Sequence, residues 1–76
     1  MHSSEKLLRR LEKTTQHDQS WVDCVDMRSR EVQRWINVLR HFANQKPGSS
    51  VADSCNQRAD DLQERLRKVL AFRGKL

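Results

Sequence analysis

The chain has very few of the residues that break helices and build turns. Its 76 residues include two glycines, one proline and no tyrosine. An all-β domain joins several short strands by turns, and such turns are rich in glycine and proline. With so little turn chemistry the sequence predicts an all-α fold. Its length allows one small module, residues 1–76, and no second domain.

Cysteine and long apolar runs are also scarce. Cys24 and Cys55 are the only cysteines, far below the density of secreted domains held by disulfides. We expect both thiols to be small core residues. No apolar run approaches the ~18 residues of a membrane span, and no signal-peptide hydrophobic region follows Met1. The sequence therefore predicts an intracellular protein, cytoplasmic or nuclear, without a membrane span.

The common catalytic and metal-binding patterns are missing as well. There is no glycine-rich phosphate loop, no calcium loop and no pair of carboxylates placed to line a cleft. His17, Asp18 and Cys24 lack the spacing of a structural zinc site. His41 and Cys55 would lie near each other in a hairpin, but thiol–imidazole catalysis also needs an orienting group and an oxyanion hole. We expect no enzyme activity, no metal and no cofactor.

What the chain does contain is a long apolar stripe with helical spacing. Its members recur at steps of three and four, the period of a helix and not of a strand. Both tryptophans belong to it, so it holds most of the large apolar area. The stripe consists of Trp21, Val22, Val25, Val32, Trp35, Ile36, Leu39, Phe42 and Ala43. Residues 21–45 are therefore predicted to form the core helix.

A basic extension, residues 1–20, precedes the core helix. Ser3 or Ser4 is placed to cap a helix there. Leu7, Leu8 and Leu11 form a short apolar strip, and three leucines are too few to stabilise an isolated helix of this length in water. We therefore expect this segment to dock on another surface.

Residues 14–20 decide whether the first helix is continuous. The passage is polar and rich in weak helix formers, and Ser20 with Asp23 resembles a capping box that would begin a new helix. It contains no glycine or proline, however, and the heptad phase of the apolar residues passes through it without a slip. We predict one helix over about 4–44. A monomeric three-helix bundle with a break near residue 18 is the alternative.

The clearest boundary is a turn at residues 46–50. Pro47 disfavours helical geometry before it, and Gly48 supplies the permissive backbone for a reversal. A short connection implies antiparallel neighbours, so the chain is predicted to form a helical hairpin. The second helix is expected over about 51–72, within a segment 51–73.

Folding the chain about the turn pairs residues whose numbers sum to about 96. The second helix then reaches back only to about Cys24, which leaves the leucines of the basic extension without a partner in the chain. The stripe that holds Trp21 and Trp35 is also wider than one thin helix can cover. Both points predict a further helix from a second copy or from another protein, in a coiled coil or helix bundle.

The tryptophan spacing gives a resemblance at the level of the fold. Trp21 and Trp35 are two heptads apart on a long heptad helix. Such helices are similar to those of spectrin-type and other cytoskeletal or scaffold bundles. The resemblance implies helix packing and names no particular activity.

These observations predict a non-enzymatic protein–protein interaction and assembly module of the scaffold or cytoskeletal type. The predicted core and partner interface comprises Leu7, Leu8, Leu11, Trp21, Val22, Val25, Val32, Trp35, Ile36, Leu39, Phe42, Leu62 and Leu66. The formal net charge of +5 suggests a basic nucleic-acid-binding module as the alternative. The predicted basic surface comprises Lys6, Arg9, Arg10, Lys13, Arg28, Arg30, Arg34 and Arg40.

Overall fold

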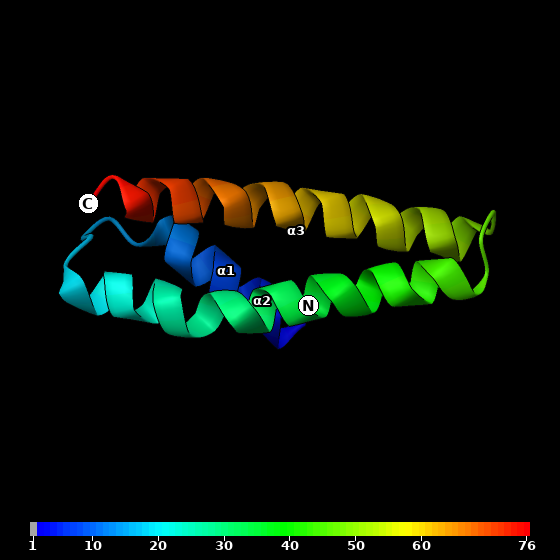
Figure 1. The fold of residues 1–76 in the computed structure, drawn as a ribbon, viewed down its shortest axis with the longest axis horizontal. Coiled ribbons are helices and arrows are strands. Elements are labelled where there is room, and N and C mark those ends of the chain that lie inside the picture. The colour runs from blue at the N-terminus through cyan, green and yellow to red at the C-terminus, as the bar shows by residue number, and fades with distance from the viewer. Residues whose placement is uncertain (1) are drawn as a thin grey trace.

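A computed structural model describes residues 2–76 as three packed helices (Figure 1). The helices are α1 (Ser3–Lys13), α2 (Gln19–Gln45) and α3 (Ser50–Gly74). The long helices α2 and α3 run antiparallel side by side, and α1 packs against both of them at one end of the hairpin (Figure 1). The prediction of an all-α helical hairpin and bundle is confirmed.

The predicted continuous helix over 4–44 is wrong, and the alternative with a break near residue 18 is what the chain forms. The backbone is extended at Thr14, after α1, and again at Asp18, before α2. In the linker between α1 and α2, the heptad positions are occupied by Thr15 and Asp18. Neither has an apolar side chain whose burial would hold the linker in a helix. Leaving the helix there costs little burial, and it lets α1 turn back onto the hairpin.

The caps of α1 and α2 also differ from those predicted. Asp18 and not Ser20 begins α2, because its carboxylate accepts a hydrogen bond from the backbone N–H of Trp21 at 3.1 Å. At the start of α1, the imidazole Nδ1 of His2 accepts from the N–H of Ser4 at 3.1 Å. Each cap satisfies a backbone donor that the first turn of a helix leaves without a partner.

The turn and the register of the hairpin agree with the sequence. Gly48 has a positive φ of 83°, which a residue with a Cβ rarely adopts. The hydroxyl of Ser49 accepts the N–H of Ala52 at 3.1 Å and begins α3. Across the helices, the Gln33 side-chain amide donates to that of Gln63 at 3.0 Å, a pair that fits the predicted register.

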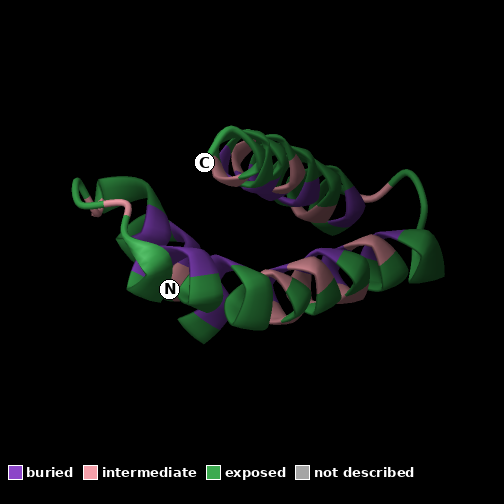
Figure 2. Cartoon of the chain, turned by 60° about the vertical axis from the view of Figure 1, so that its left-hand side comes forward, coloured by how far each residue is buried: buried purple, intermediate pink, exposed green. Residues whose placement is uncertain are grey.

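The core runs along the inner faces of the three helices, with the exposed residues turned outward (Figure 2). Leu8 is 0% exposed and Leu11 is 6% exposed, both covered by the hairpin. The expectation that these leucines lack a partner in the chain is therefore wrong, because α1 folds back over α2 and α3. The buried cluster comprises Leu8, Leu11, Trp21, Val22, Val25, Val32, Ile36, Leu39, Ala59, Leu62, Leu66 and Val69.

Helix α1 is too short to cover the whole hairpin. It has 11 residues, against 27 in α2 and 25 in α3. At one end, the indole N–H of Trp21 donates to the carbonyl of Leu11 at 3.1 Å. At the other end, His2 stacks on Trp35 with ring centroids 3.7 Å apart. Beyond Trp35 only α2 and α3 remain, and we call residues 36–57 the distal half of the hairpin.

Candidate interaction surfaces

The histidine and cysteine side chains that could bind a metal or carry catalysis are not gathered into one site. Among residues 2–76 there is no group of three side chains able to hold a metal ion. The ring of His41 bonds to Gln45 on its own helix, at 3.1 Å, while Cys55 packs against the core. Cys24 is exposed, so the expectation that both thiols are core residues is wrong for Cys24. Cys24 instead lines a groove between α1 and α2.

Most of the predicted interface residues are used inside the bundle. Those that are buried are Leu8, Leu11, Trp21, Val22, Val25, Val32, Ile36, Leu39, Leu62 and Leu66. Leu7 and Trp35 are half-buried, and Phe42 is exposed. Most of the predicted stripe is therefore core of this chain, and Trp35 and Phe42 are the members that are not buried.

The first such surface is on the distal half of the hairpin, in the line that α1 would follow if it were longer. Trp35, Leu39 and Phe42 recur at steps of four and three, so they share the face of α2 on which α1 packs. On α3, Val51 and Cys55 are four residues apart and therefore also share one face of their helix. Phe42 is 51% exposed and Val51 is 67% exposed. These side chains form an apolar strip in which Phe42 and Val51 are exposed, Trp35 and Cys55 are half-buried, and Leu39 is buried.

A concavity of about 450 Å³ borders this strip at Leu39 and Cys55. It is lined by Leu39, Ser54, Cys55, Gln57 and Arg58. The charges around it are largely paired: Arg40 contacts Asp60 at 3.2 Å, and Arg58 contacts Glu5 of α1 at 3.4 Å. We call the strip with its concavity the distal groove; it joins an apolar strip to a partly polar concavity, and its nearby arginines are paired.

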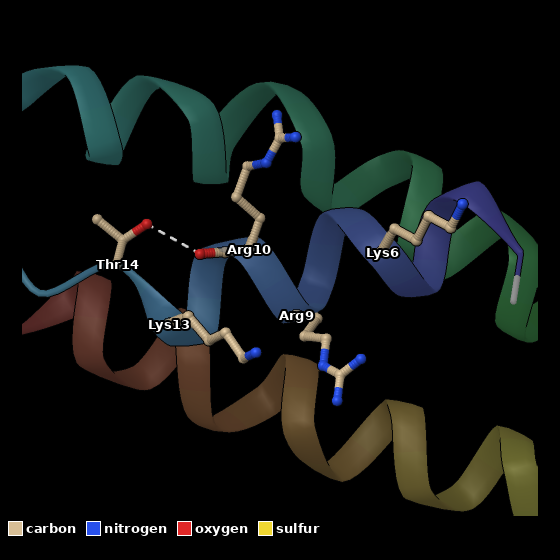
Figure 3. A pocket seen from close by; sticks show the side chains of 5 residues that line it. All are labelled: Lys6, Arg9, Arg10, Lys13 and Thr14. Carbon is tan, nitrogen blue, oxygen red and sulfur yellow. Dashed lines mark hydrogen bonds between the residues drawn. The ribbon is translucent and has the colours of Figure 1, made fainter.

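The second surface is the outer face of α1. Lys6, Arg9, Arg10 and Lys13 project from it into solvent, with Arg10 on the side of α2 and Arg9 on the side of α3 (Figure 3). Within the described chain, none of the four takes part in an ion pair. We call these four residues the cationic face.

The acidic residues of α1 are turned the other way, onto α3. Glu5 contacts Arg58, and Glu12 contacts the guanidinium of Arg65 at 2.6 Å. The guanidinium of Arg65 donates hydrogen bonds to the carboxylates of Glu12 and Asp61, and these bonds raise the pKa of Arg65 above its already high value. Because α3 neutralises both glutamates, the outside of α1 carries positive charge alone.

A groove between α1 and α2 adjoins the cationic face. Its volume is about 360 Å³. Its apolar lining comes from Leu7, Leu11, Trp21 and Cys24, and Arg10 and Arg28 stand among the lining residues. The other lining residues are Thr14, Gln16, Asp18 and Ser20. The carboxylate of Asp18 serves as the cap of α2 and accepts a backbone N–H there.

The predicted basic surface is therefore not one patch. Arg28 pairs with Glu31 at 2.9 Å and Arg40 pairs with Asp60. Arg30 lies two residues from Arg28, on nearly the opposite side of α2. Arg30 and Arg34 are exposed, and neither takes part in an ion pair in the part of the chain that is described. Only the four residues on α1 form a compact group of unpaired cations.

Sequence reasoning missed the distal groove. Phe42 belonged to the predicted stripe and interface, but residues 36–57 were not singled out, because the leucines of the basic extension were expected to be the segment without a partner in the chain. A usable signal was present: Asp18 stands three residues before Trp21, the spacing at which an aspartate caps a helix. With Asp18 as a cap, the sequence predicts that the long helix is broken and that α1 folds back.

These features define the chain as a small three-helix bundle with two unpartnered surface regions. Among residues 2–76, no helix is long and apolar enough to cross a membrane. No known family model, curated protein or solved structure matches the chain.

Proposed function

We propose that this chain is a non-enzymatic protein–protein interaction module that assembles with a second copy through its distal groove. The observation that carries the proposal is the mismatch in helix length, since α1 covers one half of the hairpin and leaves the other half as two helices. An isolated pair of helices buries too little surface on its own. A further helix lying against the distal half would complete the bundle along its whole length.

The exposed side chains are suited to such a contact. Phe42 is a large aromatic side chain, the kind that anchors interfaces when a partner covers it. Val51 on α3 and Trp35 on α2 belong to the same apolar strip. Two copies related by a two-fold axis would each place Phe42 against the groove of the other, as an isologous contact requires.

Charge also favours a second copy at this surface. Across a two-fold axis each charged group meets the same region of the partner, so a strongly charged face would repel itself. The cationic face of α1 is such a face and would repel its copy. The distal groove is not strongly charged, because Arg58 in its lining contacts Glu5 and the nearby Arg40 contacts Asp60. Self-assembly is therefore expected through the distal half and not through α1.

Sedimentation equilibrium over a concentration series tests the proposal. The patch is small, so we expect a weak dimer with a Kd of about 10–100 µM. Wild-type protein should approach twice the 9.0 kDa mass of the chain as concentration rises. Phe42→Glu should remain at 9.0 kDa throughout, because the new carboxylate would be buried at the contact.

Met27→Glu is the matched control. Met27 is also on α2 and is 68% exposed, and this substitution introduces the same charge outside the distal half. It should dimerise as the wild type does, with equal helicity of both variants measured by circular dichroism. A wild-type mass of 9.0 kDa at every concentration would refute self-assembly. Equal dimerisation of both variants would refute the distal groove as its site.

A further inference from the structure

The geometry points to a second docking surface on this chain, for an acidic amphipathic helix of a partner protein. It consists of the cationic face of α1 together with the groove between α1 and α2. This inference goes beyond the proposed self-assembly, because the surface lies on another part of the bundle and accepts a partner of different chemistry.

The spacing of the cations matches a helical partner. Lys6, Arg9, Arg10 and Lys13 recur at steps of three, one and three, which places them in a stripe along α1. Acidic residues at the same steps on a second helix would face this stripe. Arginine and lysine on a partner-free face also attract an acidic segment at long range and speed its encounter.

The groove beside the stripe selects a protein over a nucleic acid. Leu7, Trp21 and Cys24 give it an apolar lining, with Arg10 and Arg28 close by. An apolar side chain of a partner helix gains free energy by leaving water in such a groove. A sugar–phosphate backbone has no apolar group of that shape. For base stacking, α1 carries no aromatic side chain, and Trp21 in the groove is only 5% exposed.

Seven of the chain's ten acidic residues already take part in ion pairs, so a second copy is a poor occupant of this surface. On α3, Asp60 contacts Arg40, Asp61 contacts Arg65, and Glu64 contacts Arg67 at 2.6 Å. To reach a neighbouring α1 they would have to leave these partners. The acidic helix is therefore expected on a different protein.

Fluorescence anisotropy with a synthetic probe tests the inference. The probe is a labelled helical peptide with a stripe of glutamates beside a stripe of leucines, free of cysteine. Arg9→Gln/Arg10→Gln should weaken its binding about tenfold, as expected for the loss of two exposed charge contacts and part of the groove rim. Arg30→Gln/Arg34→Gln is the control, since it also removes two exposed, unpaired arginines but from a different face, on α2. It should weaken binding less than about twofold.

Two further measurements locate the bound probe. Cys24 is exposed and lines the groove, so the bound peptide should slow its alkylation by iodoacetamide, followed by mass spectrometry at each thiol. A probe with its leucines replaced by serines should bind at least several-fold more weakly. Phe42→Glu should leave peptide binding unchanged, which separates this surface from the one used for self-assembly.

Several outcomes would overturn the inference. Equal weakening by the two double variants would mean that net charge alone attracts the probe. Unchanged binding of the serine probe would show that the groove is not used. Tighter binding of a duplex DNA of mixed sequence, lost in Arg9→Gln/Arg10→Gln, would make the surface a nucleic-acid site. No detectable binding of the glutamate probe at low salt would remove the site altogether.

Discussion

Replacing Leu8 with alanine tests whether α1 is part of the folded core. Leu8 is 0% exposed, in contact with the hairpin through the inner face of α1. If α1 continued into α2 as one long helix, this side chain would lie far from α3 and largely in water. In the three-helix bundle its truncation opens a cavity between helices. The two arrangements therefore predict very different costs for the same small change.

The magnitude follows from full burial. Leucine-to-alanine changes at buried sites cost about 2–5 kcal/mol, with the lower values where the surroundings can collapse. A chain of 76 residues has a total stability of about 4–11 kcal/mol. A loss of about 3 kcal/mol would lower Tm by about 12–24 °C in a domain of this size. Alanine is the better helix former, so the loss cannot come from helix propensity.

Urea and thermal unfolding followed by circular dichroism measure this cost, with Leu7→Ala as the matched control. Leu7 is the adjacent residue of the same type on the same helix, but it is half-buried. Its truncation should cost about 1 kcal/mol. If Leu8→Ala costs no more than Leu7→Ala, then α1 does not pack on the hairpin as described. The assignment of its outer face as a separate surface would fail with it.

Three further predictions concern the ends of the helices. Trp21→Phe removes the buried indole N–H that donates to the Leu11 carbonyl at 3.1 Å, and urea unfolding should show a loss of about 1–2 kcal/mol. Gly48→Ala should lower stability by about 1 kcal/mol, measured as a lower Tm, because φ is +83° while no atom lies within 4 Å of the added Cβ. The hydrogen bond from Arg73 holds the pKa of Asp26 below its ordinary 3.8. A carboxylate with a lowered pKa in the folded state stabilises it above the ordinary pKa, and this contribution is lost as pH falls through the folded pKa. Urea unfolding at a series of pH values should therefore show that wild type is more stable than Asp26→Asn near neutral pH. This difference in stability should vanish in acid. A difference that does not change with pH would contradict the ion pair.

The hairpin could be predicted because its signals are local in the sequence. Pro47 and Gly48 mark the reversal, and Ser49 stands where a cap of α3 is needed. The apolar spacing from Trp21 to Ala43 identifies the buried face of α2 without any knowledge of its partner. Each of these features acts within a few residues, so one sequence is enough to recognise it.

The fold-back of α1 could not be predicted in the same way. A heptad phase is defined by the spacing of positions and not by the residues at them. It therefore stays regular across Thr15 and Asp18, although these polar residues contribute nothing to a core. What decides the fold is the burial of Leu8 and Leu11 against two helices distant in sequence. The cations of α1 could be found from the sequence. The separation of these cations from the arginines of α2 depends on the fold-back of α1, so it could not be predicted from the sequence.

The packing of α1 produces both proposed surfaces. Burial of Leu8, with Glu5 and Glu12 held by arginines of α3, fixes the rotation of α1 about its axis. Once that rotation is fixed, Lys6, Arg9, Arg10 and Lys13 must face solvent, on the side opposite the core. The same helix begins beside Trp35, where His2 stacks on the indole, so the distal groove is open from that point to the turn. A change that loosens α1 should therefore disturb the acidic-helix surface directly, while leaving the apolar residues of the distal groove on α2 and α3 in place.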